Sequence, residues 1–347
     1  MVLSYYFLKY PYSLIFGILS VFKLNNYYAA YIGDELDYCI LEPVLQYLPK
    51  LKLISKNKRI QNYLVDKGHK SKLLPAFPKG VLMCRLAAHK FPAKSIKKIS
   101  LTRGAYHFKA LPNKKSYLLF DKYIFTGKKE AVIARSKGIT NIIGINYPKL
   151  DKAFNGQLTP EKLEKLKNII GLDSSRLTLL FTATWDKSGM SAIKIWYDKL
   201  ENLTKKFNLL ISLHSWVSEE YKTVIRNAKG VFLISDYDTT PYVKISDICI
   251  GDTSSILGDC CALDKPIITF KVNNAKRTIP EIRQLIDSFS IFIDKFDELL
   301  PAIKKYIDNP YLKKEERDKA NSIMFSNLDG SSGAKIAESV KEMFYSK

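Results

Sequence analysis

A run of small hydroxyl and acidic residues follows a short apolar segment in the second half of this 347-residue chain. Ile248-Cys249-Ile250 has the composition of a strand that is buried on both faces. Gly251-Asp252-Thr253-Ser254-Ser255 then supplies a turn and several residues that favour the start of a helix. The unpaired N–H groups at a helix start attract anions, and three hydroxyl groups lie beside them. The pattern indicates a phosphate or diphosphate site, with an ordinary capped helix as the alternative.

The elements around this run place it at the edge of a parallel sheet. Apolar residues continue at helical spacing as far as Leu263, and Lys265-Pro266 ends the helix. A second apolar run, residues 267–270, then forms another strand. A strand, a helix and a parallel strand in succession put the start of the helix at the carboxyl edge of the sheet, where such folds bind their ligands.

The composition is that of a folded protein with one large core or, more in keeping with its length, two domain cores. Hydrophobic residues make up 46% of the chain and aromatic residues 12%, which argues against disorder. Cys249, Cys260 and Cys261 lie in apolar segments, as expected of reduced core residues. No CxxC pair or HExxH motif occurs and the four histidines are scattered, so the sequence supports no metal site. No cofactor is expected.

Positive charge is concentrated in the first half of the chain. Residues 1–150 hold 26 lysines and arginines against 7 acidic residues, whereas residues 151–347 hold 29 against 27. Such a field favours anionic lipid headgroups, a polyanionic acceptor or nucleic acid. No nucleic-acid-binding motif accompanies the charge, so nucleic acid is not an expected partner. A lysine-rich surface that serves only solubility is the alternative.

Residues 1–24 are apolar and aromatic. Only thirteen uncharged residues separate Lys9 from Lys23, which is short for a membrane span. No small-residue cleavage site follows, so a signal peptide is not expected. A helix lying in the membrane interface fits this composition, and a buried N-terminal helix is the alternative.

Short apolar runs alternate with helical patterns along the rest of the chain, which favours parallel sheets covered by helices on both faces. Strands are expected at residues 37–41, 51–55, 81–84, 98–101, 123–127, 142–145, 177–182, 209–213, 231–234, 248–250 and 267–270. Helices are expected at residues 60–66, 160–170, 192–205, 219–228 and 334–344.

We therefore expect an α/β protein with two Rossmann-like domains that face each other across a cleft. The N-terminal helix takes residues 1–24, and a basic domain for the acceptor takes residues 25–155. A nucleotide-donor domain takes residues 156–330, and a C-terminal helix takes residues 331–347. The charged segment 151–176 joins the two domains.

Two motifs in the second half resemble those of the CDP-glycerol glycerophosphotransferase family, the teichoic-acid and capsule polymer transferases with the GT-B fold. Residues 246–255 together with Lys265-Pro266 are similar to the family's Asp-x-x-Ile-Thr-Asp-Tyr-Ser-Ser…Lys-Pro motif. Residues 210–214, Leu-Ile-Ser-Leu-His, resemble its Lys-Leu-His strand end without the lysine.

Two further segments extend the resemblance, which covers roughly residues 100–275. Residues 180–185 resemble the family's Tyr-Ala-Pro-Thr-Trp-Arg loop, with Asp186 in the place of the arginine. Residues 144–151 look like its Gly-x-Pro-Arg-x-Asp signature, with a one-residue insertion and Lys149 for the arginine. The four features occur in the family's order.

The resemblance implies transfer of glycerol phosphate, or a related polyol phosphate, from a CDP-activated donor. The acceptor would be a membrane-linked or polymeric anion in the synthesis of a teichoic-acid-like or capsular polymer. It implies that Thr253, Ser254 and Ser255 hold the donor diphosphate, and that Thr182 and Thr184 also touch phosphate. An enzyme of this kind is expected in the cytoplasm, peripheral at the inner face of the cell membrane.

The roles of the acidic and basic residues stay open under this resemblance. Asp252 could cap the helix, orient His214 or bind a donor hydroxyl, and His214 could neutralise the leaving phosphate or move a proton. Arg103 stands where the family has the histidine of a His-Gly pair, and His107 follows four residues later. Arginine is a poor base but binds phosphate well. The candidate catalytic residues are therefore His214, His107 and Arg103.

Two other functions are compatible with these patterns. A GT-B glycosyltransferase that uses another nucleotide-sugar would have a similar diphosphate site. A non-catalytic relative that binds membrane or polyanion would keep the fold without the base. The sequence leaves open which polyol or sugar is transferred and what the acceptor is.

Overall fold

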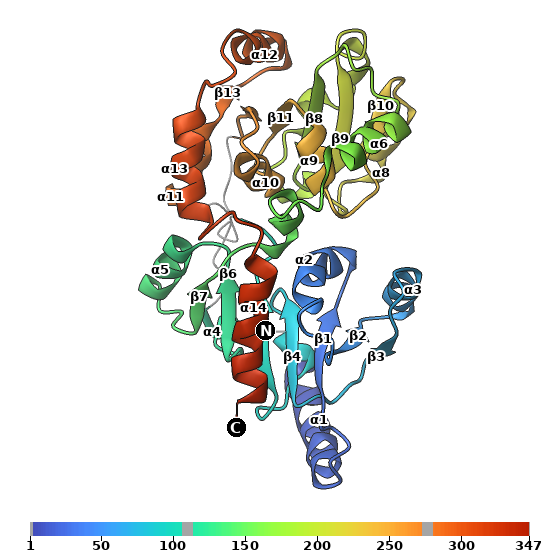
Figure 1. Ribbon diagram of the computed structural model, residues 1–347, viewed down its shortest axis with the longest axis vertical. Helices are drawn as coiled ribbons and strands as arrows, with labels where there is room; N and C mark the ends of the chain where they lie inside the picture. Colours follow the sequence, from blue (N-terminus) through green and yellow to red (C-terminus); the bar gives the residue numbers. More distant parts are fainter. Residues whose placement is uncertain (1–2, 106–113, 273–279, 347) are drawn as a thin grey trace. The chain divides into compact units, whose positions relative to one another are not determined.

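The computed structural model describes residues 3–105, 114–272 and 280–346, which divide into two compact units (Figure 1). The first unit contains the described residues up to Asp151 and those from Phe325 onward. The second unit contains the described residues from Lys152 to Met324. Each unit is a parallel sheet with helices packed against it, which is the architecture that the alternating sequence pattern predicts.

The sheet of the first unit has seven parallel strands in the order β3-β2-β1-β4-β5-β6-β7. Its strands are β1 (Tyr28–Ile32), β2 (Lys52–Ser55), β3 (Ser71–Leu73), β4 (Gly80–Cys84), β5 (Lys97–Leu101), β6 (Lys122–Phe125) and β7 (Ile142–Gly144). Its helices are α1 (Leu3–Val21), α2 (Glu35–Leu45), α3 (Lys58–Asp66), α4 (Lys114–Tyr117), α5 (Lys128–Ser136) and α14 (Ser332–Tyr345). The strand order reverses between β1 and β4.

The sheet of the second unit has six parallel strands in the order β10-β9-β8-β11-β12-β13. Its strands are β8 (Thr178–Ala183), β9 (Asn208–Leu213), β10 (Val231–Leu233), β11 (Ile248–Gly251), β12 (Ile267–Phe270) and β13 (Ile291–Ile293). Its helices are α6 (Pro160–Ile170), α7 (Ile193–Trp196), α8 (Glu219–Asn227), α9 (Thr240–Ile245), α10 (Ile256–Ala262), α11 (Pro280–Phe289), α12 (Leu299–Asp308) and α13 (Lys314–Met324). Here the strand order reverses between β8 and β11.

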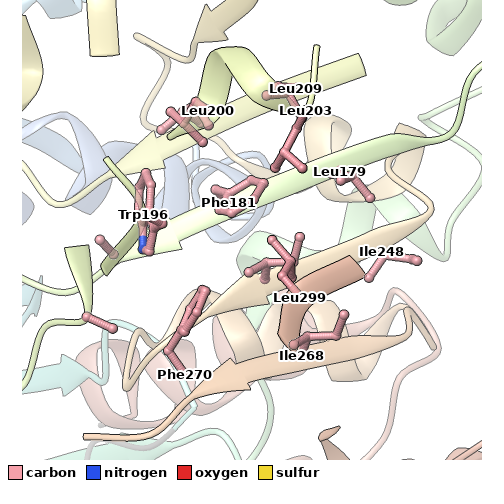
Figure 2. Packing of buried hydrophobic residues seen from close by; sticks show 14 of the residues in the cluster. Leu179, Phe181, Trp196, Leu200, Leu203, Leu209, Ile248, Ile268, Phe270 and Leu299 are labelled. Carbon is pink, nitrogen blue, oxygen red and sulfur yellow. The ribbon is translucent and has the colours of Figure 1, made fainter. Parts of the chain in front are cut away.

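One face of the second sheet carries a dense apolar core (Figure 2). Phe181 on β8 packs against Trp196 on α7 with ring centroids 5.2 Å apart, and Leu299 at the start of α12 joins the same cluster. Fully burying a side chain of this size stabilises the fold by about 1.5–3 kcal/mol relative to leaving it exposed. The core therefore fixes the strands whose carboxyl ends carry the polar residues described below.

Two sequence predictions are wrong about local structure. Residues 37–41, predicted as a strand, lie inside helix α2, and the strand of this region is β1, which the prediction missed. Nearly all of this part of α2 is buried, and a short continuous apolar run does not distinguish a buried helix from a buried strand. The Asp34 carboxylate accepts a hydrogen bond from the Asp37 N–H at 3.0 Å and starts the helix.

The predicted helix 192–205 is likewise replaced by two shorter pieces, α7 and a 3₁₀ turn at Leu200–Asn202. The apolar residues that suggested one helix, Ile193, Trp196, Leu200 and Leu203, are all buried. Spacings of three and four residues suit a chain of tight turns as well as a continuous α-helix. The predicted burial of these side chains is confirmed, whereas the prediction of one continuous α-helix is wrong.

Helix α14 belongs to the first unit, although α13, which precedes it, belongs to the second. The Asp151 carboxylate accepts hydrogen bonds from the N–H groups of Ser332 at 3.2 Å and Gly333 at 2.7 Å, and so holds the first turn of α14. A Cβ atom on Gly333 would lie 2.1 Å from the Pro43 carbonyl oxygen, so glycine permits α14 to approach α2 closely. The family signature at residues 144–151 thus ends on a residue that fastens the C-terminal helix.

Among the described residues, no helix combines the length and the apolarity needed to cross a bilayer.

Candidate active site

The carboxyl ends of β8 and β11 meet where the strand order of the second sheet reverses. In open parallel sheets this switch point is where ligands bind, because the loops that follow the two strands diverge and leave a crevice. Gly251 ends β11, and a Cβ atom there would lie 2.8 Å from the Thr182 Cγ2 atom on β8. Glycine therefore allows the two strand ends to pack closely.

Two pairs of hydroxyl groups join these strand ends. The Thr182 hydroxyl donates to Ser254 Oγ at 3.1 Å, and the Oγ1 atoms of Thr184 and Thr253 lie 3.1 Å apart. The Thr253 hydroxyl also donates to the Met190 carbonyl oxygen at 3.1 Å. The structure therefore brings these four predicted hydroxyl residues into one buried cluster within the second unit.

The predicted diphosphate residues differ in how far a ligand can reach them. Thr182 is fully buried behind Ser254, so its hydroxyl positions the serine side chain. Ser255, which follows the cluster in sequence, is half-buried at the start of α10 and is more accessible than the four members. Ser254 Oγ also accepts a hydrogen bond from the Ile256 N–H at 3.4 Å. Ser255 is thus the hydroxyl residue that a ligand reaches most readily, and Thr182 is the most deeply buried.

Asp252 fastens the loop that follows β8. Its two carboxylate oxygens accept from the Thr184 N–H at 3.0 and 3.1 Å, and Oδ2 also accepts from the Ala192 N–H at 3.0 Å. One predicted role of Asp252 was to cap helix α10. The residue at the N-cap of α10 is Ser255, so this prediction is wrong. A buried carboxylate that accepts several backbone hydrogen bonds holds both ends of a loop in place.

His214 follows β9, the strand next to β8. Its Nδ1 atom accepts a hydrogen bond from the Trp216 N–H at 3.2 Å. The neutral ring therefore carries its proton on Nε2 and presents a donor there. The side chain is exposed, and the Trp216 ring packs edge-on against both His214 and Trp185.

Asp186, which replaces the arginine of the family loop, joins the loops that follow β8 and β9. Its carboxylate accepts from the Ser218 N–H at 2.9 Å and from the Ser218 hydroxyl at 2.7 Å. Burial acts to raise the pKa of Asp186, but the hydrogen bonds from Ser218 outweigh it and the pKa is lowered. The substitution thus exchanges a cation for a residue that fixes loop geometry.

A cavity of about 320 Å³ opens beside the hydroxyl cluster. It is bordered by Asp252 and Thr253 on one side and by residues at the carboxyl ends of β12 and β13 on the other. Lys271 and Asp294, whose Nζ and Oδ1 atoms are 3.5 Å apart, line its polar part. The sequence analysis missed both residues; strand β13, which Asp294 follows, was not predicted.

The predicted residues of the first half lie in the other unit. Arg103 follows β5, and its Nη2 atom donates to Asp34 Oδ1 at 2.6 Å while its Nε atom lies 3.2 Å from Asp37 Oδ1. His107 lies outside the described residues. Sequence reasoning missed Asp34, Asp37 and their second partner, Arg85. Identifying β1 as a strand would have placed the two aspartates at a carboxyl strand end.

Comparison with known proteins identifies the family. Residues 102–342 match the model of the CDP-glycerol:poly(glycerophosphate) glycerophosphotransferase family. The chain belongs to this family. The matched segment begins at the end of β5 and runs into α14, so it includes the hydroxyl cluster, His214 and Arg103.

A curated relative agrees with the family assignment. A teichoic acid poly(glycerol phosphate) polymerase of Bacillus spizizenii is 26% identical over 185 residues, which are 49% of this chain and 41% of that protein. The match thus spans about two-fifths of the length of the curated relative.

Solved structures confirm the predicted α/β, GT-B-like fold. The wall teichoic acid polymerase TagF superposes with a TM-score of 0.71 and 16% identity over 97% of each chain. A UDP complex of MnaA from S. aureus superposes with a TM-score of 0.65 and 12% identity over 92% of this chain and 96% of that one. At these identities the likeness establishes the fold alone.

Proposed function

We propose that this chain transfers glycerol phosphate from CDP-glycerol to a hydroxyl group of a teichoic-acid-like polymeric acceptor. The acceptor oxygen attacks the distal phosphorus and its proton passes to solvent water, while the bond from that phosphorus to the bridging oxygen breaks and CMP leaves. Family membership supports the reaction class. The observation that carries the proposal for this chain is the hydroxyl cluster at the switch point of the second sheet, which Asp252 holds in place.

The hydroxyl cluster suits a diphosphate that must be held in one orientation. Phosphoryl transfer depends chiefly on positioning and on stabilising the charge of the leaving group. Ser254 and Ser255 offer hydroxyl donors, Thr182 holds Ser254 from the interior, and Thr253 is fixed by its hydrogen bond to the Met190 carbonyl oxygen. In this proposal the two serines bind the donor phosphates directly, and the two threonines act by positioning.

His214 serves as a donor to the leaving phosphate in this proposal. Because Nδ1 accepts from the Trp216 N–H, the neutral imidazole has its proton on Nε2 and no lone pair there to take up another. It can therefore donate a hydrogen bond to an oxygen of CMP. It does not act as the base that deprotonates the acceptor.

Arg103 is no substitute for the family histidine as a base. Its guanidinium keeps its proton at any working pH, and both Asp34 and Asp37 engage it. A loose transition state needs little help from a base, because the nucleophile gains charge late. The first unit therefore contributes to the reaction by binding.

Nucleotide release distinguishes the proposed donor from its alternatives. Purified protein is incubated with CDP-glycerol, CDP-ribitol or UDP-N-acetylglucosamine together with a poly(glycerol phosphate) acceptor, and released CMP and UDP are measured. We expect CMP from CDP-glycerol in excess over CMP from CDP-ribitol, and no UDP. Release of UDP would instead identify a nucleotide-sugar transferase. Release of neither nucleotide would identify a non-catalytic relative.

We also propose that α1 docks on an anionic membrane surface at the inner face of the cell membrane. One face of α1 packs on the first unit through Tyr12, whose hydroxyl donates to the Ala76 carbonyl oxygen at 2.5 Å, and through the buried Phe16. Several other apolar side chains of α1 are exposed, with Phe7 at 75% and Leu14 at 67%. An exposed apolar face beside a lysine-rich half is the combination that interfacial helices use.

Vesicle flotation tests this membrane proposal. We expect the protein to float with phosphatidylglycerol vesicles, and Leu14→Asp to lower the bound fraction at least about fivefold through lost apolar insertion. Ile169→Asp on α6 is the matched control, because Ile169 is also an exposed apolar helix residue, at 72%. Equal binding of Leu14→Asp and the unmodified protein would contradict the proposal.

A further inference from the structure

The first sheet has its own switch point, and four charged side chains meet there. The strand order reverses between β1 and β4. Asp34 and Asp37 follow β1, Arg85 follows β4, and Arg103 follows β5, so all four belong to the carboxyl edge of this sheet. We call these four residues the Arg–Asp quartet.

Each arginine of the quartet contacts both aspartates. Arg103 binds Asp34 and Asp37 at 2.6 and 3.2 Å. Arg85 binds Asp34 through Nη2, and its Nη2 and Nε atoms lie 3.0 and 3.4 Å from the two carboxylate oxygens of Asp37. Asp37 also accepts from the Gly33 N–H at 2.9 Å, and its side chain is fully buried. The two carboxylates thus hold the two guanidinium groups side by side.

The backbone around the quartet is constrained to present these side chains. Arg85 has φ +67°, a left-handed conformation that costs an L-residue about 1–2 kcal/mol. The Ser100 hydroxyl donates to the Arg85 carbonyl oxygen at 2.7 Å. The Tyr147 hydroxyl donates to the Arg103 carbonyl oxygen at 3.1 Å. Strain that the surrounding structure holds in place is typical of functional sites.

Both arginines have N–H donors on Nη1 that the contacts with the aspartates do not use. Their hydrogen bonds and ion pairs with the aspartates use Nε and Nη2, and within the described residues no hydrogen bond engages Nη1 of either. Their side chains are 33% and 28% exposed. Two adjacent guanidinium groups with unused N–H donors match the oxygens of a phosphate group.

We propose that Arg85 and Arg103 form a phosphate-binding subsite that holds a phosphodiester of the acceptor chain at the switch point of the first sheet. This inference rests on the proposed glycerophosphotransferase function. Asp34 and Asp37 position the two guanidinium groups and cancel their net charge. The subsite therefore binds a phosphodiester with modest affinity and can release a growing chain.

The aspartates themselves do not supply the missing base. Burial acts to raise the pKa of Asp34, but the charges of Arg103 and Arg85 outweigh it and hold the pKa below its usual range. Asp37 is buried, which raises its pKa, but its side chain has no exposed surface from which to reach an acceptor hydroxyl. The quartet is thus suited to binding.

Calorimetric titration with a soluble tri(glycerol phosphate) oligomer, in the absence of donor, tests the subsite. We expect Arg103→Gln to weaken oligomer binding about tenfold or more, because a hydrogen-bonded charge is lost. Asp34→Asn is expected to tighten binding severalfold, because one competing carboxylate is neutralised. Lys70→Gln, at the opposite edge of the sheet just before β3, removes one exposed charge and is the matched control.

The two variants move the affinity in opposite directions only if the arginines bind the ligand. Unchanged oligomer affinity in folded Arg103→Gln would overturn the subsite, as would a loss of affinity in Asp34→Asn. If Arg103→Gln does not fold, Arg103→Lys, which keeps the charge, replaces it in the test. We expect Arg103→Lys to bind the oligomer severalfold more weakly. If neither arginine variant folds, tighter binding by Asp34→Asn supports the subsite, and equal or weaker binding overturns it.

The same proteins separate this inference from the proposed function. CDP-glycerol affinity should stay within twofold in Arg103→Gln, because the donor site lies in the other unit. Oligomer binding that depends on Arg103, in a protein that releases no CMP from CDP-glycerol, would leave the subsite standing and refute the transferase. Arg103→Gln that changes binding to phosphatidylglycerol vesicles but not to the oligomer would assign the arginines to a lipid headgroup and overturn the acceptor subsite.

Discussion

The two units place different chemistry at the same topological position. The switch point of the second sheet, between β8 and β11, is lined by neutral hydroxyl groups around one buried carboxylate. The switch point of the first sheet, between β1 and β4, holds two arginines and two aspartates. The parallel sheet decides where a ligand binds, and the loops after its strands decide which ligand it is.

The difference suits two ligands with different fates. The donor diphosphate is short and must be held in one orientation for in-line displacement, the role that we propose for the fixed hydroxyls and the histidine donor. An acceptor polymer offers repeated phosphodiesters and must move on after each transfer. A charge-balanced pair of arginines would hold it without trapping it. Each prediction below tests whether donor chemistry is confined to the second unit.

His214→Ala is expected to have the largest effect. Losing the Nε2 donor to the leaving phosphate should lower kcat at least about a hundredfold, the usual scale for one lost hydrogen-bond donor to a transition state. Steady-state CMP release measures this, with His89→Ala in the first unit as the control. A loss of fewer than about fivefold would remove His214 from the chemistry.

Asp252→Asn is expected to come next, because it removes the carboxylate that joins both ends of the β8–α7 loop. Leaving a buried backbone N–H without its partner costs about 1–3 kcal/mol. CDP-glycerol affinity should fall about tenfold, and urea unfolding should show a less stable second unit. Asp236→Asn, another aspartate of this unit, is the control. Unaltered donor affinity in folded Asp252→Asn would separate the loop from the donor site.

Ser254→Ala and Ser255→Ala are expected to have smaller effects. Each removes one neutral hydrogen bond, worth about 1 kcal/mol, so CDP-glycerol should bind about fivefold more weakly by calorimetry. Ser288→Ala on α11 is the control, since that hydroxyl donates to the Leu285 carbonyl oxygen within its own helix. If both variants bound CDP-glycerol with the affinity of the unmodified protein, the proposed diphosphate site would be refuted. The contrast between the two switch points would then be refuted as well.

Much of the fold was predictable because most strands here are apolar runs bounded by turn residues. Segments such as 209–213 and 267–270 coincide closely with β9 and β12. Helix α2 was not predictable as a helix, because residues 37–41 are all buried and this uninterrupted run does not show the helical period. Missing β1 then hid Asp34 and Asp37 from the candidate residues.

The donor motif was predictable for a different reason. Its hydroxyls are contiguous in sequence, so a single segment, residues 251–255, carries the pattern. The Arg–Asp quartet draws on three separate loops, and only contact geometry brings Arg85 and Arg103 onto the same carboxylates. Asp252 was placed in the motif, yet its partners, the N–H groups of Thr184 and Ala192, are 68 and 60 residues away in sequence.

The central claim is that the second unit binds CDP-glycerol and passes its glycerol phosphate to a polymer. Phosphorus NMR of the purified protein with CDP-glycerol and tri(glycerol phosphate) tests this most directly. The account predicts that the diphosphate signals give way to one CMP and one new phosphodiester per transfer. CMP formed without a new phosphodiester, or no change in the diphosphate signals, would contradict it.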